Sequence, residues 1–116
     1  MHFKLIIALT EDSITDRVVE AAKAKGATGS TVISSARGEG MEATKTFLGL
    51  NLETQRDVIL LLVEEHMSRD ILESIEASGE FEANPGSGIA FSIDVEDAVG
   101  VSHQVNQLSE LVEEEI

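Results

Sequence analysis

The sequence contains no cysteine, no tryptophan and no tyrosine, and only one proline in 116 residues. Without cysteine there are no disulfides, no thiolate nucleophile and no cysteine-ligated zinc. Without tryptophan or tyrosine, the chain has few rings for aromatic cages or for platforms that stack nucleic-acid bases. Basic residues are also scarce: the chain has 8 basic and 22 acidic residues, which gives a net charge of −14. So acidic a chain gains little affinity by neutralising phosphates, and we expect no nucleic-acid partner.

Long apolar runs are absent as well. The N-terminal stretch HFKLIIAL is much shorter than the roughly 20 residues of a membrane-spanning helix, and no small-residue cleavage site follows it. We therefore expect a cytoplasmic protein. With 42% hydrophobic and 26% charged residues, the composition is typical of one globular domain with one core.

One pattern of elements occurs twice along the chain. An alternating strand over residues 3–9 precedes a helix that Thr10 is expected to cap and Gly26 to end, and residues 30–34 form the next strand. Likewise, a strand over residues 58–64 precedes a helix that starts at Ser68 and ends at Gly79, and residues 89–95 form the fourth strand. Two such units predict an α+β fold, the ferredoxin-like βαββαβ sandwich, whose four-stranded antiparallel sheet carries both helices on one face.

The strand over residues 58–64 is apolar on both sides. Ile59, Leu61 and Val63 alternate with further aliphatic residues, so the helices cover one side and the other side needs a second cover. Oligomerisation is the simplest cover.

Three features together resemble the PII (nitrogen regulatory protein P-II) signal-transduction family, in its divergent PII-like branch. They are the segment GATGSTVISSARGEG (residues 26–40), the long connection after it, and GSGIAFSIDVEDAVGV (residues 86–101). The resemblance covers residues 3–101. It implies a homotrimer whose sheets pack together inside, adenine nucleotide binding in clefts between subunits, and a regulator rather than an enzyme. Residues 1–103 would form the PII-like domain and residues 104–116 an acidic C-terminal helix or tail.

The resemblance also implies which residues contact the ligand. The loop with Pro85 falls on the family's B-loop, whose backbone N–H groups face nucleotide phosphates, although a Pro-Gly pair also makes ordinary turns. Ile89 stands where the family usually has a lysine, and Glu96 and Asp97 lie where arginines are common. We therefore expect AMP or ADP rather than ATP. The expected ligand contacts are Thr31, Arg37, Gly38, Gly40, Gly86, Ser87 and Gly88.

Residues 37–57 fall on the family's T-loop, an arm that docks into target proteins. The arm has no tyrosine, which excludes the tyrosine uridylylation of some family members. Arg37 and Lys45 are either contacts for an anionic ligand or target, or solvated side chains. A helical turn is expected within residues 41–50, and residues 38–46 are expected to be mobile without ligand.

The main interpretation is a sensor of a small anionic metabolite that regulates a partner, such as a transporter or an enzyme, in nitrogen or related metabolism. An alternative is a structural or divalent-metal-responsive trimer similar to the CutA proteins. A small hydrolase similar to acylphosphatases is a third, although LTEDSIT (residues 9–15) lacks the arginine and asparagine that it needs. We expect no metal site, with solvated Glu64 and Glu65 and surface or interface positions for the histidines, which are His2, His66 and His103.

Overall fold

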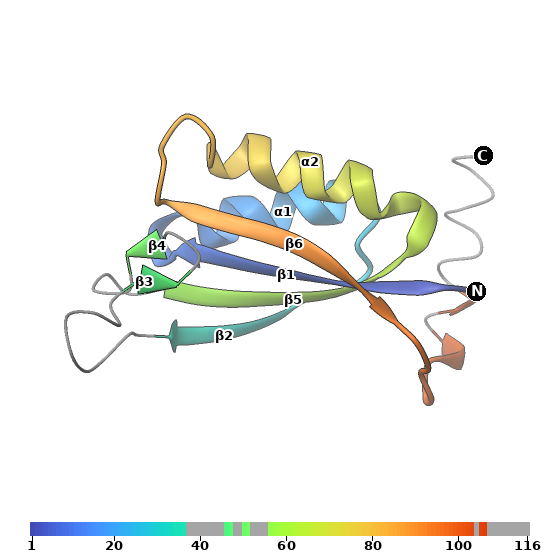
Figure 1. Cartoon of the computed structure of the whole chain (residues 1–116). Helices are drawn as coiled ribbons and strands as arrows, with labels where there is room; N and C mark the ends of the chain where they lie inside the picture. The colour runs from blue at the N-terminus through green and yellow to red at the C-terminus, as the bar shows by residue number, and fades with distance from the viewer. Residues whose placement is uncertain (37–45, 48–49, 52–55, 104, 107–116) are drawn as a thin grey trace.

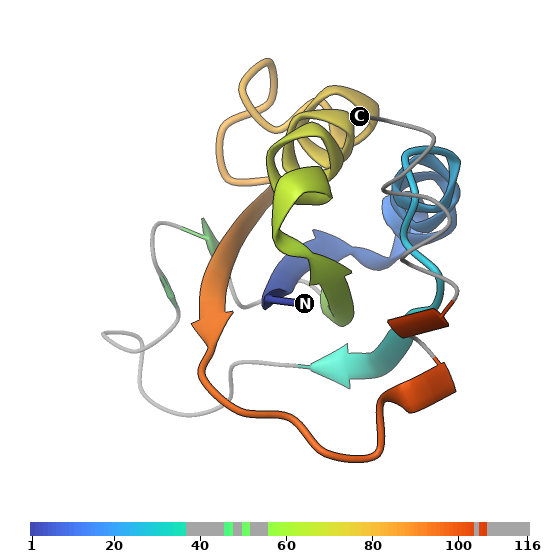
Figure 2. The ribbon, with the colours of Figure 1, turned by 90° about the vertical axis from the view of Figure 1, so that its right-hand side faces the viewer.

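The computed structural model describes residues 1–36, 46–47, 50–51, 56–103 and 105–106. Its main sheet has four antiparallel strands in the order β2-β5-β1-β6, and both α-helices lie on one face of this sheet (Figures 1 and 2). This arrangement confirms the ferredoxin-like prediction. The elements are β1 (Phe3–Glu11), α1 (Thr15–Ala24), β2 (Thr31–Ala36), β5 (Arg56–Glu64), α2 (Ser68–Gly79) and β6 (Gly88–Val95).

A small two-stranded ribbon lies within the arm. Its strands are β3 (Thr46–Phe47) and β4 (Leu50–Asn51), with Phe47 opposite Leu50. The helical turn expected within residues 41–50 is therefore wrong at residues 46–47 and 50, because these residues pair as strands, and the rest of that stretch lies outside the described residues. The predicted mobility of residues 38–46 concerns a segment almost wholly outside the described residues.

The core lies between the helices and the sheet. The register places Ile6 opposite Leu61 and Ala8 opposite Ile59, and these four side chains on the two central strands are fully buried. Side chains on one face of each helix complete the core at the spacing of an amphipathic helix. From the helices come Val18, Val19, Ala22, Ile71 and Ile75.

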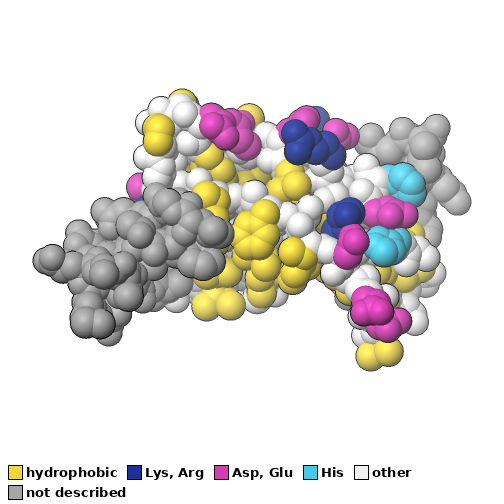
Figure 3. All heavy atoms as spheres, in the orientation of Figure 1, with side chains coloured by type: hydrophobic (Ala, Val, Ile, Leu, Met, Phe, Trp, Pro, Cys, Tyr) yellow, Lys and Arg dark blue, Asp and Glu magenta, His cyan; other side chains and the backbone are white. Residues whose placement is uncertain are grey.

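The other face of the sheet is also apolar but only partly buried. Ile7 lies opposite Leu60 on one neighbouring strand and opposite Phe91 on the other, so the register gathers aliphatic and aromatic side chains there. Figure 3 shows hydrophobic side chains on the surface around β6. The chain after β6 passes beneath this face at one end of the sheet (Figure 2). The prediction of a two-sided apolar central strand is therefore confirmed.

The start of the first helix differs from the prediction, whereas the second helix starts at Ser68 as predicted. Strand β1 extends to Glu11, and a 3₁₀ turn, η1 (Asp12–Ile14), precedes α1, so Thr10 is a buried strand residue and not a helix cap. Its Oγ1 forms a hydrogen bond of 2.8 Å with Oγ1 of Thr15, across this turn. At the second junction a 3₁₀ turn, η3 (Glu65–Met67), precedes α2, and Ser68 is the first helical residue.

Glycines end both helices, as predicted. Gly26 has a left-handed φ of 110°, and its N–H donates to the carbonyl of Lys23 at 3.1 Å. Gly79 is the last residue of α2, but there the left-handed residue is Glu80, with φ 54°. Among the described residues, no helix is long and apolar enough to cross a membrane.

Glu64 caps the turn before α2 with its side chain. It is buried, which corrects the expectation that Glu64 is solvated, while Glu65 is exposed. One carboxylate oxygen of Glu64 accepts a hydrogen bond of 2.8 Å from the backbone N–H of His66, and the other oxygen contacts Nδ1 of His66. The side-chain hydrogen bond between Glu64 and Nδ1 of His66, and then the charge of Glu64, raise the pKa of His66 above its ordinary value.

The raised pKa of His66 makes a stability prediction. A raised pKa means that protonation of His66 stabilises the folded state. This stabilisation is fully present below the ordinary pKa of about 6.5 and is lost as pH rises through the raised pKa. We expect His66→Gln to lower the thermal unfolding midpoint at pH 5.5, and the difference from wild type to shrink toward pH 9. In a Glu64→Gln background, His66→Gln should have little further effect on the unfolding midpoint at any pH. A pH-independent effect of His66→Gln would contradict the pairing.

Candidate functional site

The glycine loop between α2 and β6 is built by local backbone hydrogen bonds. The N–H of Asn84 donates to the carbonyl of Glu80, and the N–H of Ser87 donates to the carbonyl of Asn84, both at 3.0 Å. Gly88 begins β6, and a Cβ at this position would lie 2.4 Å from the ring of Phe81 and 2.9 Å from a backbone oxygen. Packing alone therefore requires the glycine at position 88, whatever the loop binds.

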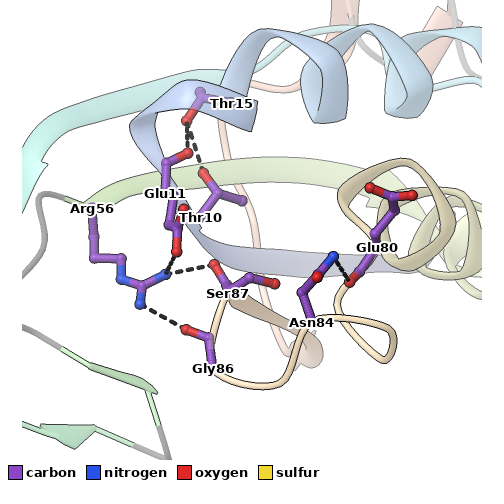
Figure 4. A network of polar contacts seen from close by, with 8 residues as sticks. All are labelled: Thr10, Glu11, Thr15, Arg56, Glu80, Asn84, Gly86 and Ser87. Atoms are coloured by element: carbon purple, nitrogen blue, oxygen red, sulfur yellow. Dashed lines mark hydrogen bonds and ion pairs between the residues drawn. The ribbon is translucent and has the colours of Figure 1, made fainter.

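Arg56 ties this loop to the central sheet. It is the first residue of β5 and is 1% exposed. Its Nη1 donates to the carbonyl of Ser87 at 2.5 Å and its Nη2 donates to the carbonyl of Gly86 at 2.7 Å, while the carboxylate of Glu11 lies 4.0 Å from Nη1 (Figure 4). A buried guanidinium is stable only with such partners. The conformation of the loop therefore depends on Arg56.

Sequence reasoning missed Arg56, because residues 37–57 were assigned to the arm as one unit. The available signal was an arginine directly before a long apolar strand. Paired with Glu11 across the sheet, such a residue is an inward-facing cation at the strand start. Ile89 is partly buried, and Glu96 and Asp97 are exposed, so the missing lysine and arginines of the family pattern have no replacement at those positions.

Ser87 has a buried hydroxyl without a hydrogen-bond partner among the described residues. A buried hydroxyl left unpaired costs about 1–3 kcal/mol, so a site that offers one favours a polar ligand atom beside it. Ser87 is one of the residues predicted to contact the ligand.

A second polar network fixes the other side of the β5 start. Asp57 is buried, and Oγ1 of Thr15 donates to its carboxylate at 2.7 Å. Because an ionised carboxylate only accepts, Thr10 donates in turn to Thr15. Consecutive strand residues point to opposite faces. Arg56 and Asp57 therefore connect the strand that follows the arm to the glycine loop and to the start of α1.

Thr31 lies in a separate cavity of about 450 Å³. Its described lining combines two aliphatic side chains with hydroxyl groups and one imidazole, and includes no Asp, Glu, Lys or Arg. Such a lining suits a flat, uncharged group that makes hydrogen bonds at its edge. The lining residues are Thr28, Gly29, Ser30, Thr31, Leu60, Leu62 and His103.

The two halves of the expected site lie on opposite edges of the sheet. Thr31 is on edge strand β2, and Gly88 begins edge strand β6. Three strand spacings of about 4.8 Å separate these strands, roughly 14 Å across the sheet. One chain therefore does not bring Thr31 to the glycine loop. Arg37, Gly38, Gly40 and Lys45 lie outside the described residues.

A larger cavity of about 540 Å³ lies between α2 and β6. Three glutamates, Glu73, Glu76 and Glu82, line it, and Arg69, the one arginine among its described lining residues, donates to Glu73 at 3.0 Å. This negative lining disfavours a phosphate group. Gly88 also lines this cavity, which therefore borders the glycine loop.

The contacts of Arg56 make the second prediction. Arg56→Met removes two donors to the loop and leaves the partly buried carbonyls of Gly86 and Ser87 without these hydrogen bonds, so we expect a loss of about 1–3 kcal/mol in stability. Hydrogen exchange of residues 84–88 should become faster. Arg56→Lys should be intermediate, because one ammonium cannot reproduce the forked contact.

Arg69→Met is the matched control, because Arg69 is exposed and makes one i,i+4 ion pair worth about 0.3–0.5 kcal/mol. Equal effects of the Arg56 and Arg69 substitutions on loop exchange would show that Arg56 does not hold the loop.

Comparison with solved structures finds the same fold in PII-like proteins. CPII from Thiomonas intermedia K12, bound to ADP, AMP and acetate, is 19% identical, with 86% of this chain and 92% of that chain covered and a TM-score of 0.64. CPII bound to ADP, AMP and bicarbonate is 18% identical, with 85% and 98% covered and a TM-score of 0.57. A putative PII-like signaling protein from Thermus thermophilus is 27% identical, with 82% and 88% covered and a TM-score of 0.59.

No curated protein matches the sequence. The family model for nitrogen regulatory protein P-II matches residues 3–104, which is most of the chain. This match and the shared fold confirm the resemblance seen in the sequence. The chain belongs to the nitrogen regulatory protein P-II family.

Proposed function

We propose that this chain is a PII-like sensor that forms a homotrimer, binds AMP or ADP in clefts between subunits, and regulates a partner protein through residues 37–57. The observation that carries the proposal is the position of the two half-sites on opposite edges of one sheet. A cleft between two copies would bring the β2 edge of one chain to the β6 edge of the next. The homotrimer expected from the family resemblance supplies three such clefts.

The two half-sites differ in chemistry as the two ends of a nucleotide do. The cavity at Thr31 offers apolar walls and hydroxyl groups, which suit a base and a ribose. The glycine loop offers the unpaired hydroxyl of Ser87 above the buried charge of Arg56, which suits a phosphate. Glu11 lies beside Arg56 and offsets part of that charge. We therefore assign one or two phosphates to the ligand rather than three.

The relatives support a nucleotide together with a second small anion. Two CPII structures hold ADP and AMP, one with acetate and the other with bicarbonate. We extend this to the present chain as a sensor whose ligand set includes a small anionic metabolite. Its role would be regulatory and not catalytic, in the cytoplasm, with a transporter or an enzyme of nitrogen or related metabolism as the target.

A divalent-metal-responsive trimer is the second candidate, and one observation favours it. Ligand atoms of Glu64, Glu65 and His66 lie within 4.8 Å of one another. However, Nδ1 of His66 already contacts Glu64, so a metal ion would have to displace that contact. Elemental analysis of the purified protein separates the candidates, because only a metal-responsive trimer would hold a stoichiometric divalent ion.

The nucleotide prediction uses calorimetry and light scattering on the same sample. We expect a particle of three times the 12.5 kDa chain mass that binds ADP and AMP more tightly than ATP. Ser87→Ala should weaken ADP binding about tenfold, because the loop loses a hydroxyl that pairs with the ligand. Ser13→Ala, an exposed change in η1, is the control. A stable monomer, or tight ATP binding, would contradict the proposal.

The arm provides a separate prediction. A ligand changes the arm only if it binds one arm conformation better than another. We expect ADP to slow hydrogen exchange in residues 38–46, since residues 37–40 would contact the ligand in the cleft. Residues 71–75 in the core of α2 serve as the internal reference. Unchanged exchange in residues 38–46 with ADP bound would remove the signalling step and leave a static nucleotide-binding trimer.

A further inference from the structure

The chain after β6 returns to the far edge of the sheet. Gly100 has a left-handed φ of 79°, and a Cβ there would meet nothing within 4 Å, so the position needs glycine for its backbone turn alone. One helical turn follows, in which the N–H of Val105 donates to the carbonyl of Val101 at 2.9 Å. This turn carries His103 to the cavity beside β2.

His103 gives the cavity a group that its other described residues lack. The side chains of Leu60 and Leu62 form apolar walls, and the hydroxyls of Thr28 and Thr31 can hydrogen-bond at the edge. His103 adds the one aromatic ring among the described lining residues. An imidazole ring can stack on a base, and its two nitrogens can donate and accept hydrogen bonds.

We propose that His103 contacts the nucleobase, so that the segment after β6 forms one wall of the nucleotide site. This inference rests on the proposed function, and it concerns the base end of the ligand. The described lining residues include no Lys or Arg, so we do not expect a contact with the phosphates there. The contact with His103 strengthens the binding of ligands that carry a heteroaromatic ring, and it does not strengthen the binding of anions that lack such a ring.

Two ligands separate contact with the base from contact with the phosphates. ADP carries a base, and inorganic pyrophosphate carries a comparable anion without one. Calorimetry on the full chain should show that His103→Ala weakens ADP binding about fivefold or more. The same change should leave pyrophosphate binding within about twofold of wild type. Because His103 is exposed, its truncation leaves no cavity in the core.

Two further variants complete the design. Ser102→Ala changes the adjacent exposed residue, which does not line the cavity, and should bind ADP within about twofold of wild type. Gly100→Ala strains the turn that positions His103 and should weaken ADP binding without removing any ligand contact.

The outcomes are distinguishable. If wild type binds ADP and His103→Ala binds it equally well, the inference about His103 is wrong and the proposed function stands. Equal weakening of ADP and pyrophosphate would place His103 at the phosphates and also overturn the inference. If wild type binds neither AMP nor ADP, the proposed function fails and the role of His103 fails with it.

Discussion

The antiparallel pairing of β1 with β5 is the constraint on which the rest of the structure depends. Both strands are apolar on both faces, so neither face of the sheet can be left to water at no cost. The helices bury the centre of one face, where Ile6 and Leu61 are fully buried. The other face, around Ile7 and Leu60, remains partly exposed in the single chain. Burial of this second face against further copies of the chain would remove its apolar side chains from water.

The fold could be predicted from the sequence because its signals are local. Alternation, apolar helix stripes and terminal glycines are each read within a dozen residues, and they gave the order of elements correctly. The start of α1 was wrong because a 3₁₀ turn comes between the strand and the helix there, and a cap rule does not foresee it, whereas α2 starts at Ser68 as predicted. The helical turn expected within residues 41–50 was wrong at residues 46–47 and 50 for a different reason. These residues form strands of two residues, which are too short to show a periodic pattern in the sequence.

The candidate site was predicted only in part, because its key contacts join distant segments. The glycine loop and Thr31 were found through the family resemblance. Arg56 was not, although it holds that loop, because its partners lie 30 and 31 residues further along the chain. His103 was predicted at a surface or interface position and is exposed, but nothing local shows that the segment after β6 returns to β2. The hydrophobic periodicity of a helix or strand does not predict contacts between residues so far apart in the sequence.

The placement of the half-sites on opposite sheet edges has a genetic consequence. In a ring of three copies, each cleft would take its cavity from one chain and its glycine loop from the next. If the proposed cleft is correct, a ring of chains damaged at Thr31, or a ring of chains damaged at Ser87, would have no cleft with both halves intact. A ring that mixes the two kinds of chain would have one intact cleft. Two defective alleles of this protein would therefore complement each other, which a site contained in one chain does not allow.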